Sequence, residues 1–296
     1  FQTEAEADAN NTAGAVRLAD NITPLADAQL RTDLAAGTAS IFGITAERVG
    51  SYLKYDNVAE MKVSNPPIGS RIKLNRFRSG EDLLSGLEYV IQSAGGANEY
   101  IDHTLANGNI AKLMFLGSLN IKLAGAVGDA FGAGSFDETA IVTACLLQVS
   151  DITFPEGEFR IDGTISLGLR KTLRLLNGAV LRRTTDTSNT DPIVHFINQG
   201  SSVLGSGQNT STISSLNDSP NGVMLLGASA ALLIQNPQLN SNTVYFNNIS
   251  GLRVSAANYG IWLKGWANAN TISNIQGYRL GDDTILGGAL FYDNGS

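Results

Sequence analysis

The chain has 296 residues, of which 43% are hydrophobic and only 16% are charged, against about 25% charged in an average globular protein. The apolar share is large enough for a folded core, and 32 glycines favour a chain rich in turns. A net charge of −7 argues against nucleic-acid binding, because that needs clustered Lys and Arg to neutralise phosphates.

Cysteine and hydropathy patterns exclude further classes. Cys145 is the only cysteine, so an intrachain disulfide framework and a cysteine-based zinc site are excluded. No apolar stretch approaches the roughly 18 residues that a membrane helix needs. We therefore expect a soluble protein without membrane insertion. Because the chain begins at Phe1 and not at Met, we expect a cut N-terminus.

Residues 1–48 are Ala-rich and predict a helical segment. The best helix covers residues 23–36, where Thr23 can act as the N-cap and Gly37 suits the left-handed residue that ends a helix. Its apolar stripe, Leu30 and Leu34 with Ala26, is thin. Such a stripe is suited to several chains meeting around an axis. A helix lying on its own domain explains the pattern equally well.

Residues 49–123 predict a small α+β domain. Alternation at Ile72 and Leu74 indicates a strand, and the turn residues 107–109 are typical of a hairpin. The stretch from Glu81 to Ala94 is expected to form a short amphipathic helix.

Residues 124–148 predict a linker and a capping helix. Ser135 and Glu138 have the spacing of a capping box. The helix is expected to run to Gln148, with an apolar face that covers the open end of the following domain; Ile141, Ala144 and Cys145 form this face.

Residues 149–296 predict stacked β-coils. Short apolar runs alternate with Gly, Asn, Asp and Ser, and the segment 249–252 is echoed by 272–275, about one coil later. Counted from Gly125 to Ser296, coils of about 24 residues would give roughly seven rungs. A β-sandwich also has short strands, but it prefers hairpin turns, and Asn-Gly signals are scarce here. We expect the coils to continue beyond Ser296, because a solenoid that stops there exposes its apolar cross-section.

Several segments, taken together, resemble bacteriophage tailspikes with a right-handed parallel β-helix of the pectate-lyase type. Those similar to the spike's neck are residues 30–44, 55–74 and 102–117, and those similar to the opening of the β-helix are residues 128–145 and 152–167. The second group contains the corner Phe154-Pro155-Glu156-Gly157, which predicts a type I turn. The resemblance implies a mainly β protein in which a helical neck and a small α+β neck domain precede the β-helix.

The resemblance also implies a function. The protein would be a homotrimer in the phage virion, attached through its N-terminus to tail or baseplate proteins. It would recognise host surface polysaccharide and, at full length, degrade it by hydrolysis or elimination. The alternatives are a non-enzymatic fibre or branching adaptor that carries another spike, and a secreted pectate-lyase-like enzyme.

No catalytic residue is assigned. Hydrolysis would need two carboxylates about 5–9.5 Å apart, and the candidates are Asp282 and Asp283, with Asp293 nearby. Adjacent aspartates in a loop more often form a turn, and we favour that interpretation. The acids of the first rung, listed as Asp151, Glu156, Glu158 and Asp162, are interpreted as structural. His103 and His195 do not form a metal site, and neither a metal nor a cofactor is predicted.

Both tryptophans, Trp262 and Trp266, fall in one short stretch beside Tyr259. If Ile261 and Leu263 point inward, Trp262 points outward. An outward Trp can stack on the apolar face of a sugar ring, and the two tryptophans are therefore the predicted substrate-binding residues. Packing against a neighbouring subunit is the competing interpretation.

Overall fold

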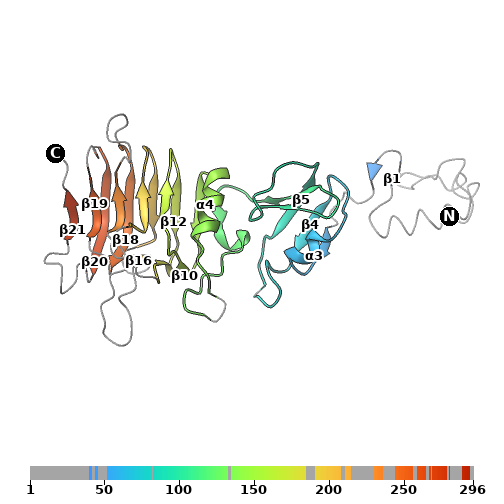
Figure 1. The fold of residues 1–296 in the computed structure, drawn as a ribbon, viewed down its shortest axis with the longest axis horizontal. Helices are drawn as coiled ribbons and strands as arrows, with labels where there is room; N and C mark the ends of the chain where they lie inside the picture. The colour runs from blue at the N-terminus through green and yellow to red at the C-terminus, as the bar shows by residue number, and fades with distance from the viewer. Residues whose placement is uncertain are drawn as a thin grey trace, which may run out of the picture.

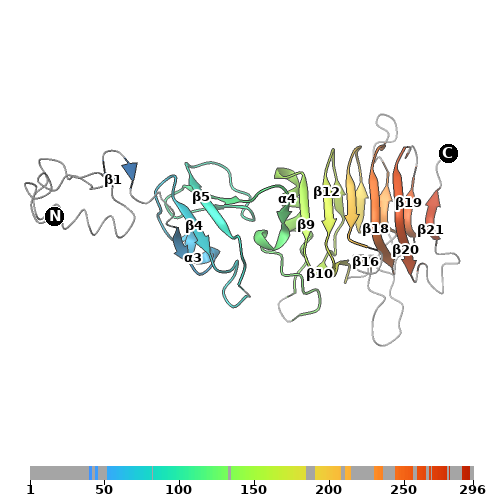
Figure 2. The same cartoon turned by 180° about the vertical axis from the view of Figure 1, so that it is seen from behind.

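The computed structural model describes residues 40–41, 44–45, 52–81, 83–132, 135–184, 191–207, 211–214, 230–235, 244–255, 259–264, 267, 269–278, 280 and 289–293. These residues form an elongated molecule, in which a small sheet is followed by a helix and then by a stack of coils (Figures 1 and 2). The helix predicted over 23–36 lies outside the described residues. Close by, β1 (Ser40–Ile41) and β2 (Ile44–Thr45) form a short antiparallel pair.

The first unit combines a five-stranded sheet with one short helix. Its sheet has the order β3-β4-β5-β7-β6, and the helix α3 (Val58–Lys62) follows β3. The strands are β3 (Leu53–Tyr55), β4 (Arg71–Leu74), β5 (Glu88–Gln92), β6 (Asp102–Thr104) and β7 (Ile110–Met114). β6 and β7 form the predicted hairpin, and Ile72 and Leu74 are fully buried as expected.

The prediction of a helix over residues 81–94 is wrong. Glu88–Gln92 is a strand that pairs antiparallel with β4 and β7. The buried residues Leu87, Tyr89 and Ile91 alternate with period two, whereas Leu83, on the expected helix face, is 72% exposed. Tertiary pairing on both edges therefore overrides the helical pattern.

A second segment joins this domain to the coils. β8 (Leu119–Asn120) pairs in parallel with β9, and the 3-10 helix η2 (Ile121–Ala124) follows it. The predicted capping helix is confirmed as α4 (Thr139–Gln148), and it buries Ile141 and Cys145. One hydrophobic core runs from the first domain through α4 into the coils, so this segment is packed and is not a free linker.

The predicted capping box is absent from this helix. The N-cap Glu138 makes no side-chain bond to the helix, and the Ser135 hydroxyl donates to the carbonyl of Ala130. Instead, Asp137 accepts the backbone N–H of Thr139. The side chain of Glu138 is needed elsewhere, as described below.

Residues from Asp151 onward form a parallel β-helix. All strand pairs between its coils are parallel, which excludes the β-sandwich. One sheet, here called the long sheet, contains β9 (Asp151–Phe154), β10 (Gly157–Arg160), β12 (Thr172–Leu175), β13 (Ala179–Arg182), β15 (Ser202–Gly205), β16 (Thr212–Ser214), β18 (Asn248–Ser255) and β20 (Thr271–Tyr278), with β8 at its edge. The other, here called the short sheet, has the order β11-β14-β17-β19-β21. Its strands are β11 (Ile165–Leu167), β14 (Val194–Phe196), β17 (Ala230–Ile234), β19 (Tyr259–Leu263) and β21 (Ala289–Asp293).

The coils are less regular than the sequence predicts. Ile249 pairs with Ile272 and Leu252 with Ile275, which confirms the predicted echo of 23 residues. However, Ser202 pairs with Asn248, so that coil takes 46 residues. Within the described residues the short sheet has five strands, and the expectation of seven uniform coils is wrong because insertions lengthen single coils.

Aligned apolar columns hold the stack together. In the long sheet Ile152, Leu173 and Val203 occupy matching positions in successive coils, and each is fully buried. Burying such a side chain contributes about 1.5–3 kcal/mol. The corner between β9 and β10 contains Pro155 and Glu156, but the N–H of Gly157 donates to Gly178 of the next coil. The next coil thus takes up the N–H that would close a hydrogen-bonded turn at this corner, and the type I turn stays a prediction.

Candidate functional site

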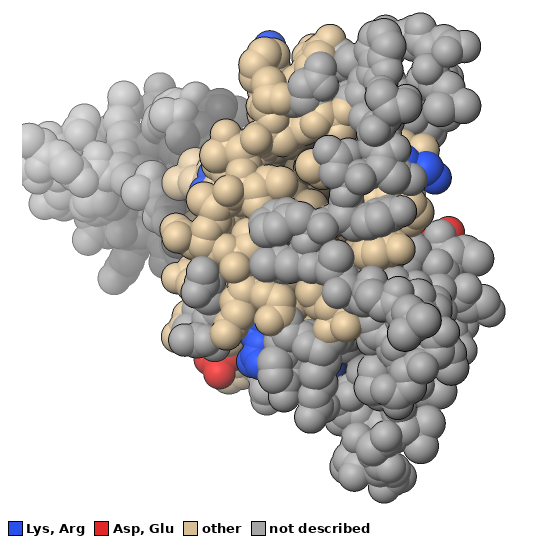
Figure 3. Space-filling model, turned by 90° about the vertical axis from the view of Figure 1, so that its left-hand side faces the viewer, with Lys and Arg blue, Asp and Glu red and all other residues tan. Residues whose placement is uncertain are grey.

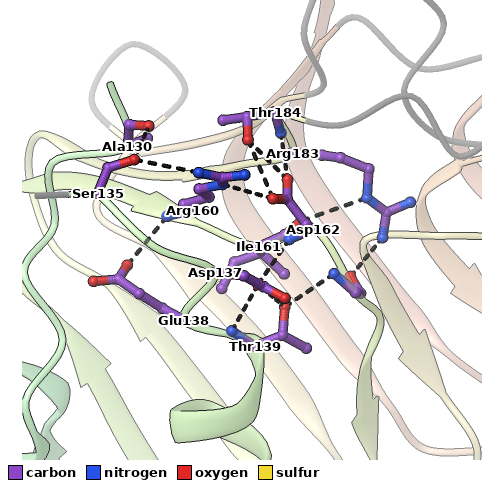
Figure 4. Close-up of polar contacts among 11 residues, drawn as sticks. Ala130, Ser135, Asp137, Glu138, Thr139, Arg160, Ile161, Asp162, Arg183 and Thr184 are labelled. Atoms are coloured by element: carbon purple, nitrogen blue, oxygen red, sulfur yellow. Dashed lines mark hydrogen bonds and ion pairs between the residues drawn. The ribbon is translucent and has the colours of Figure 1, made fainter. Parts of the chain in front are cut away.

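The densest polar cluster lies where α4 meets the first coil (Figure 4). The Glu138 carboxylate, 2% exposed, accepts the backbone N–H groups of Val127, Gly128 and Arg160. Burial raises the pKa of Glu138 in spite of these bonds. Each oxygen of this carboxylate therefore fixes backbone, and the residue ties the incoming segment and the first coil to the start of α4.

Asp162, which lies just after β10, has a similar structural role (Figure 4). It accepts the N–H and hydroxyl of Thr184 at 2.8 and 2.9 Å and pairs with Arg160 at 2.6 Å. Burial raises the pKa of Asp162, but the bonds from Thr184 and Arg160 outweigh it and hold the pKa below its usual value. An ionised carboxylate with these partners is suited to linking coils and not to donating a proton.

Arg183 completes the cluster from inside the stack. Its side chain is fully buried, and its guanidinium donates to the carbonyls of Gly163 (2.5 Å), Asp191 (2.7 Å) and Pro192 (2.9 Å). These carbonyls belong to two successive coils. The cluster therefore has a structural role: it links α4 and the first two coils through hydrogen bonds.

The acids of the first rung have the structural surroundings that the sequence favours. Asp151 pairs with Arg174 at 2.8 Å, and Glu158 pairs with Arg182 at 2.9 Å. In both pairs the arginine comes from the following coil. Glu156 is exposed at its corner.

The predicted catalytic candidates are not placed by the structure. Asp282 and Asp283 lie outside the described residues. Asp293 is described by its backbone alone, which pairs with Leu263 in the short sheet. Among the described residues, no group of three or more His, Cys, Asp or Glu side chains could hold a metal ion.

The outward face of the short sheet carries a different set of side chains. Strand register places one outward residue of successive coils in a single column, which runs Ser166, His195, Leu233 and Trp262. The neighbouring inward column, which includes Ile165, Val194, Leu232 and Ile261, is fully buried. The predicted orientation of Trp262 is therefore confirmed.

Trp262 is half-buried and lies among chemically distinct neighbours. Its ring centroid is 5.3 Å from that of Tyr259, and the Lys264 ammonium lies 4.9 Å from the centroid of its ring. The cation–π geometry holds the lysine over the indole. Trp266, the second predicted residue, lies outside the described residues.

His195 has a defined tautomer. Its Nε2 lies 3.0 Å from the backbone carbonyl of Gln235, and because a carbonyl can only accept, Nε2 carries the proton. Burial, together with the charge of Lys264, lowers the pKa of His195 in spite of the bond to Gln235. The imidazole is neutral at pH 7, and Nδ1 presents a lone pair. One ring nitrogen of this strand histidine is thus satisfied by the backbone.

Leu233 shows that this face is packed. It occupies an outward position between His195 and Trp262, yet it is only 6% exposed. Adjacent strands are about 4.8 Å apart, so the backbones of β14 and β19, which flank β17, lie about 10 Å from each other. We call His195, Leu233, Trp262 and Lys264, with Tyr259 beside them, the short-sheet platform.

Only part of this platform was predicted from the sequence. His195, Leu233 and Lys264 were not predicted to bind a ligand, although each follows the same alternation as Trp262. The uneven lengths of the coils concealed the register that aligns them. Seen from the C-terminal end of the stack, the described surface is mainly uncharged, and charged side chains lie at its edges (Figure 3).

Among the described residues, no helix has the length and apolar character needed to cross a bilayer. No protein-family model and no curated protein matches the chain.

Several solved structures are similar to this chain, and they are of the kind that the sequence motifs resemble. The tailspike protein of Acinetobacter baumannii phage AM24 has 14% identity and a TM-score of 0.41, over 75% of this chain and 42% of that chain. The enzymatically active domain of tailspike protein 4 from bacteriophage CBA120 has 17% identity and a TM-score of 0.40, over 85% and 35%. Pantoea stewartii WceF, described as a glycan biofilm modifying enzyme with a tailspike-like parallel β-helix fold, has 12% identity and a TM-score of 0.32, over 83% and 52%. The chain spans about 35–52% of the length of these structures.

Proposed function

We propose that this chain is the N-terminal portion of a bacteriophage tailspike and that its short-sheet platform binds polysaccharide of the host surface. The observation that supports the proposal is the outward Trp262, flanked by Tyr259 and set in a packed face. The apolar faces of aromatic rings can stack on the C–H faces of sugars, while Tyr and Trp also offer a polar edge.

For the whole protein we propose a homotrimer in the virion tail, attached to tail or baseplate proteins through its N-terminus. The thin apolar stripe in the sequence of residues 23–36, for which a helix is predicted, and the sequence motifs support this assembly. We further propose that the full-length protein degrades the polysaccharide, whereas this span contributes binding, because the first-rung acids Asp151, Glu158 and Asp162 are engaged in links between coils. A reducing-end or unsaturated-uronate assay of the full-length protein distinguishes a depolymerase from a non-enzymatic adaptor.

The test of binding uses a panel of immobilised bacterial capsular and O-antigen polysaccharides, measured by biolayer interferometry. We expect at least one polymer to bind, and Trp262→Ala to weaken it about tenfold or more, which corresponds to at least 1.4 kcal/mol. Phe131→Ala is the matched control. The Phe131 side chain is also aromatic and is 63% exposed, but it lies in the segment before α4, beside the Arg182 guanidinium and away from the short sheet.

Light scattering of the same variants tests the competing interpretation. If Trp262→Ala leaves every polysaccharide affinity unchanged and instead reduces the oligomer mass, Trp262 is a subunit contact and the binding proposal is wrong. An unchanged mass with reduced affinity supports it.

A further inference from the structure

The short-sheet platform has a charge that its structural role does not explain. Lys264 lies over Trp262 and its backbone N–H donates to Ile234, but its ammonium has no carboxylate partner among the described residues. By contrast, Arg174 and Arg182 on the long sheet are each matched to an acid of the preceding coil. The short sheet thus presents an unmatched cation directly after the end of β19.

The neighbours of Lys264 define what this cation can recognise. Trp262 places an apolar ring beside the ammonium, which lies 4.9 Å from the centroid of that ring. On the other side of Leu233, His195 uses Nε2 to donate to Gln235 and leaves Nδ1 as an acceptor. A ligand that fits must therefore combine an apolar ring face, a negative group and a hydroxyl donor within about 10 Å.

Sugar acids have this combination of groups. The C–H face of a uronate ring stacks on an indole, its carboxylate pairs with an ammonium, and its hydroxyls donate to a neutral imidazole. A neutral hexose satisfies the indole and the imidazole but leaves the lysine unmatched. We infer that the short-sheet platform selects an anionic glycan in which a uronate pairs with Lys264, an inference that rests on the proposed polysaccharide binding.

The experiment compares each uronate-containing polymer of the panel with its own carboxyl-reduced form, which has the same backbone without the charge. We expect the wild-type chain to bind the acidic form about tenfold more tightly or better, and to lose much of this preference as NaCl rises from about 50 to about 500 mM, because salt screens exposed charges. Lys264→Gln should abolish the preference, whereas Lys264→Arg should retain most of it.

The controls separate this inference from the proposal on which it rests. Lys54→Gln changes an exposed lysine on β3 and should leave the preference intact. Equal, Trp262-dependent affinity for acidic and reduced polymers would overturn the uronate assignment and leave polysaccharide binding standing. Binding that ignores both Trp262→Ala and Lys264→Gln, or no binding to any polymer, would overturn both.

Discussion

Acid should destabilise this protein through His103, a histidine buried in the first domain. Its side chain is 1% exposed, its Nε2 lies 3.3 Å from the Tyr89 hydroxyl, and Phe77 packs against its ring. Burial lowers the pKa of His103 to about 4, although the nearby Glu99 carboxylate acts in the opposite direction. The unfolded chain, with a histidine pKa near 6.5, therefore binds a proton that the folded chain rejects.

The sign and size of the effect follow from this difference in pKa. The unfolded state binds more protons between about pH 6.5 and pH 4, so stability falls as pH falls through this window. Proton linkage then gives a loss of about 2 kcal/mol between pH 7 and pH 5, and about 3 kcal/mol once both states are protonated. A change of 2 kcal/mol corresponds to a Tm shift of about 4–8 °C.

The assay compares wild type with His103→Gln by thermal unfolding at pH 7 and at pH 5. Gln lacks the titration, so the wild type should lose about 4–8 °C more than the variant over this range. Asp102, whose pKa is raised by burial, makes an opposite contribution, and His195 makes one of the same sign. Both remain in the two proteins and cancel in the comparison. Equal losses in wild type and variant would refute the reasoning.

Two further predictions concern the coils. Gly205→Ala should destabilise the fold by several kcal/mol, because the added Cβ would clash with the carbonyl oxygen of Gly251 in the next coil. The control is Gly168→Ala, where the added Cβ meets open space, and it should change the stability by less than about 1 kcal/mol. Chemical denaturation measures both, and comparable effects would contradict the close approach. Arg183→Met should cost about 3 kcal/mol or more, since charged hydrogen bonds to buried carbonyls are lost. Arg174→Met, which removes the ion pair with Asp151, should cost under about 1 kcal/mol, and a reversed order would disprove the role of burial.

Much of the fold could be predicted because its strongest determinants are local. Alternation at Ile72 and Leu74 gives a strand, and the apolar face of residues 139–148 gives a helix. The predicted echo of Ile249 at Ile272 gives parallel stacking. Each of these patterns lies within a few residues or within one coil of the sequence. The element can therefore be predicted without knowing a distant partner.

The remaining features depend on partners that the sequence does not reveal. Glu138 has capping-box spacing, but three N–H groups from outside the helix compete for its carboxylate. Residues 88–92 fit a helix locally and become a strand because two neighbours pair with them. Likewise, His195 and Trp262 share one column only because each pairs with Leu233 in a neighbouring strand, and the unequal lengths of the coils hide this register in the sequence.

The two sheets of the β-helix divide structure and recognition between them. On the long sheet, the outward charges Asp151 and Glu158 are matched by arginines of the next coil, so its charges lock coils together and leave little charge for a ligand. On the short sheet, inter-coil order comes from backbone pairing and the inward apolar column, and Lys264 forms no ion pair with a carboxylate within the described part of the chain. A substitution of Lys264 therefore breaks no ion pair between coils, so the charge of this face can change while the stacking of the coils is kept.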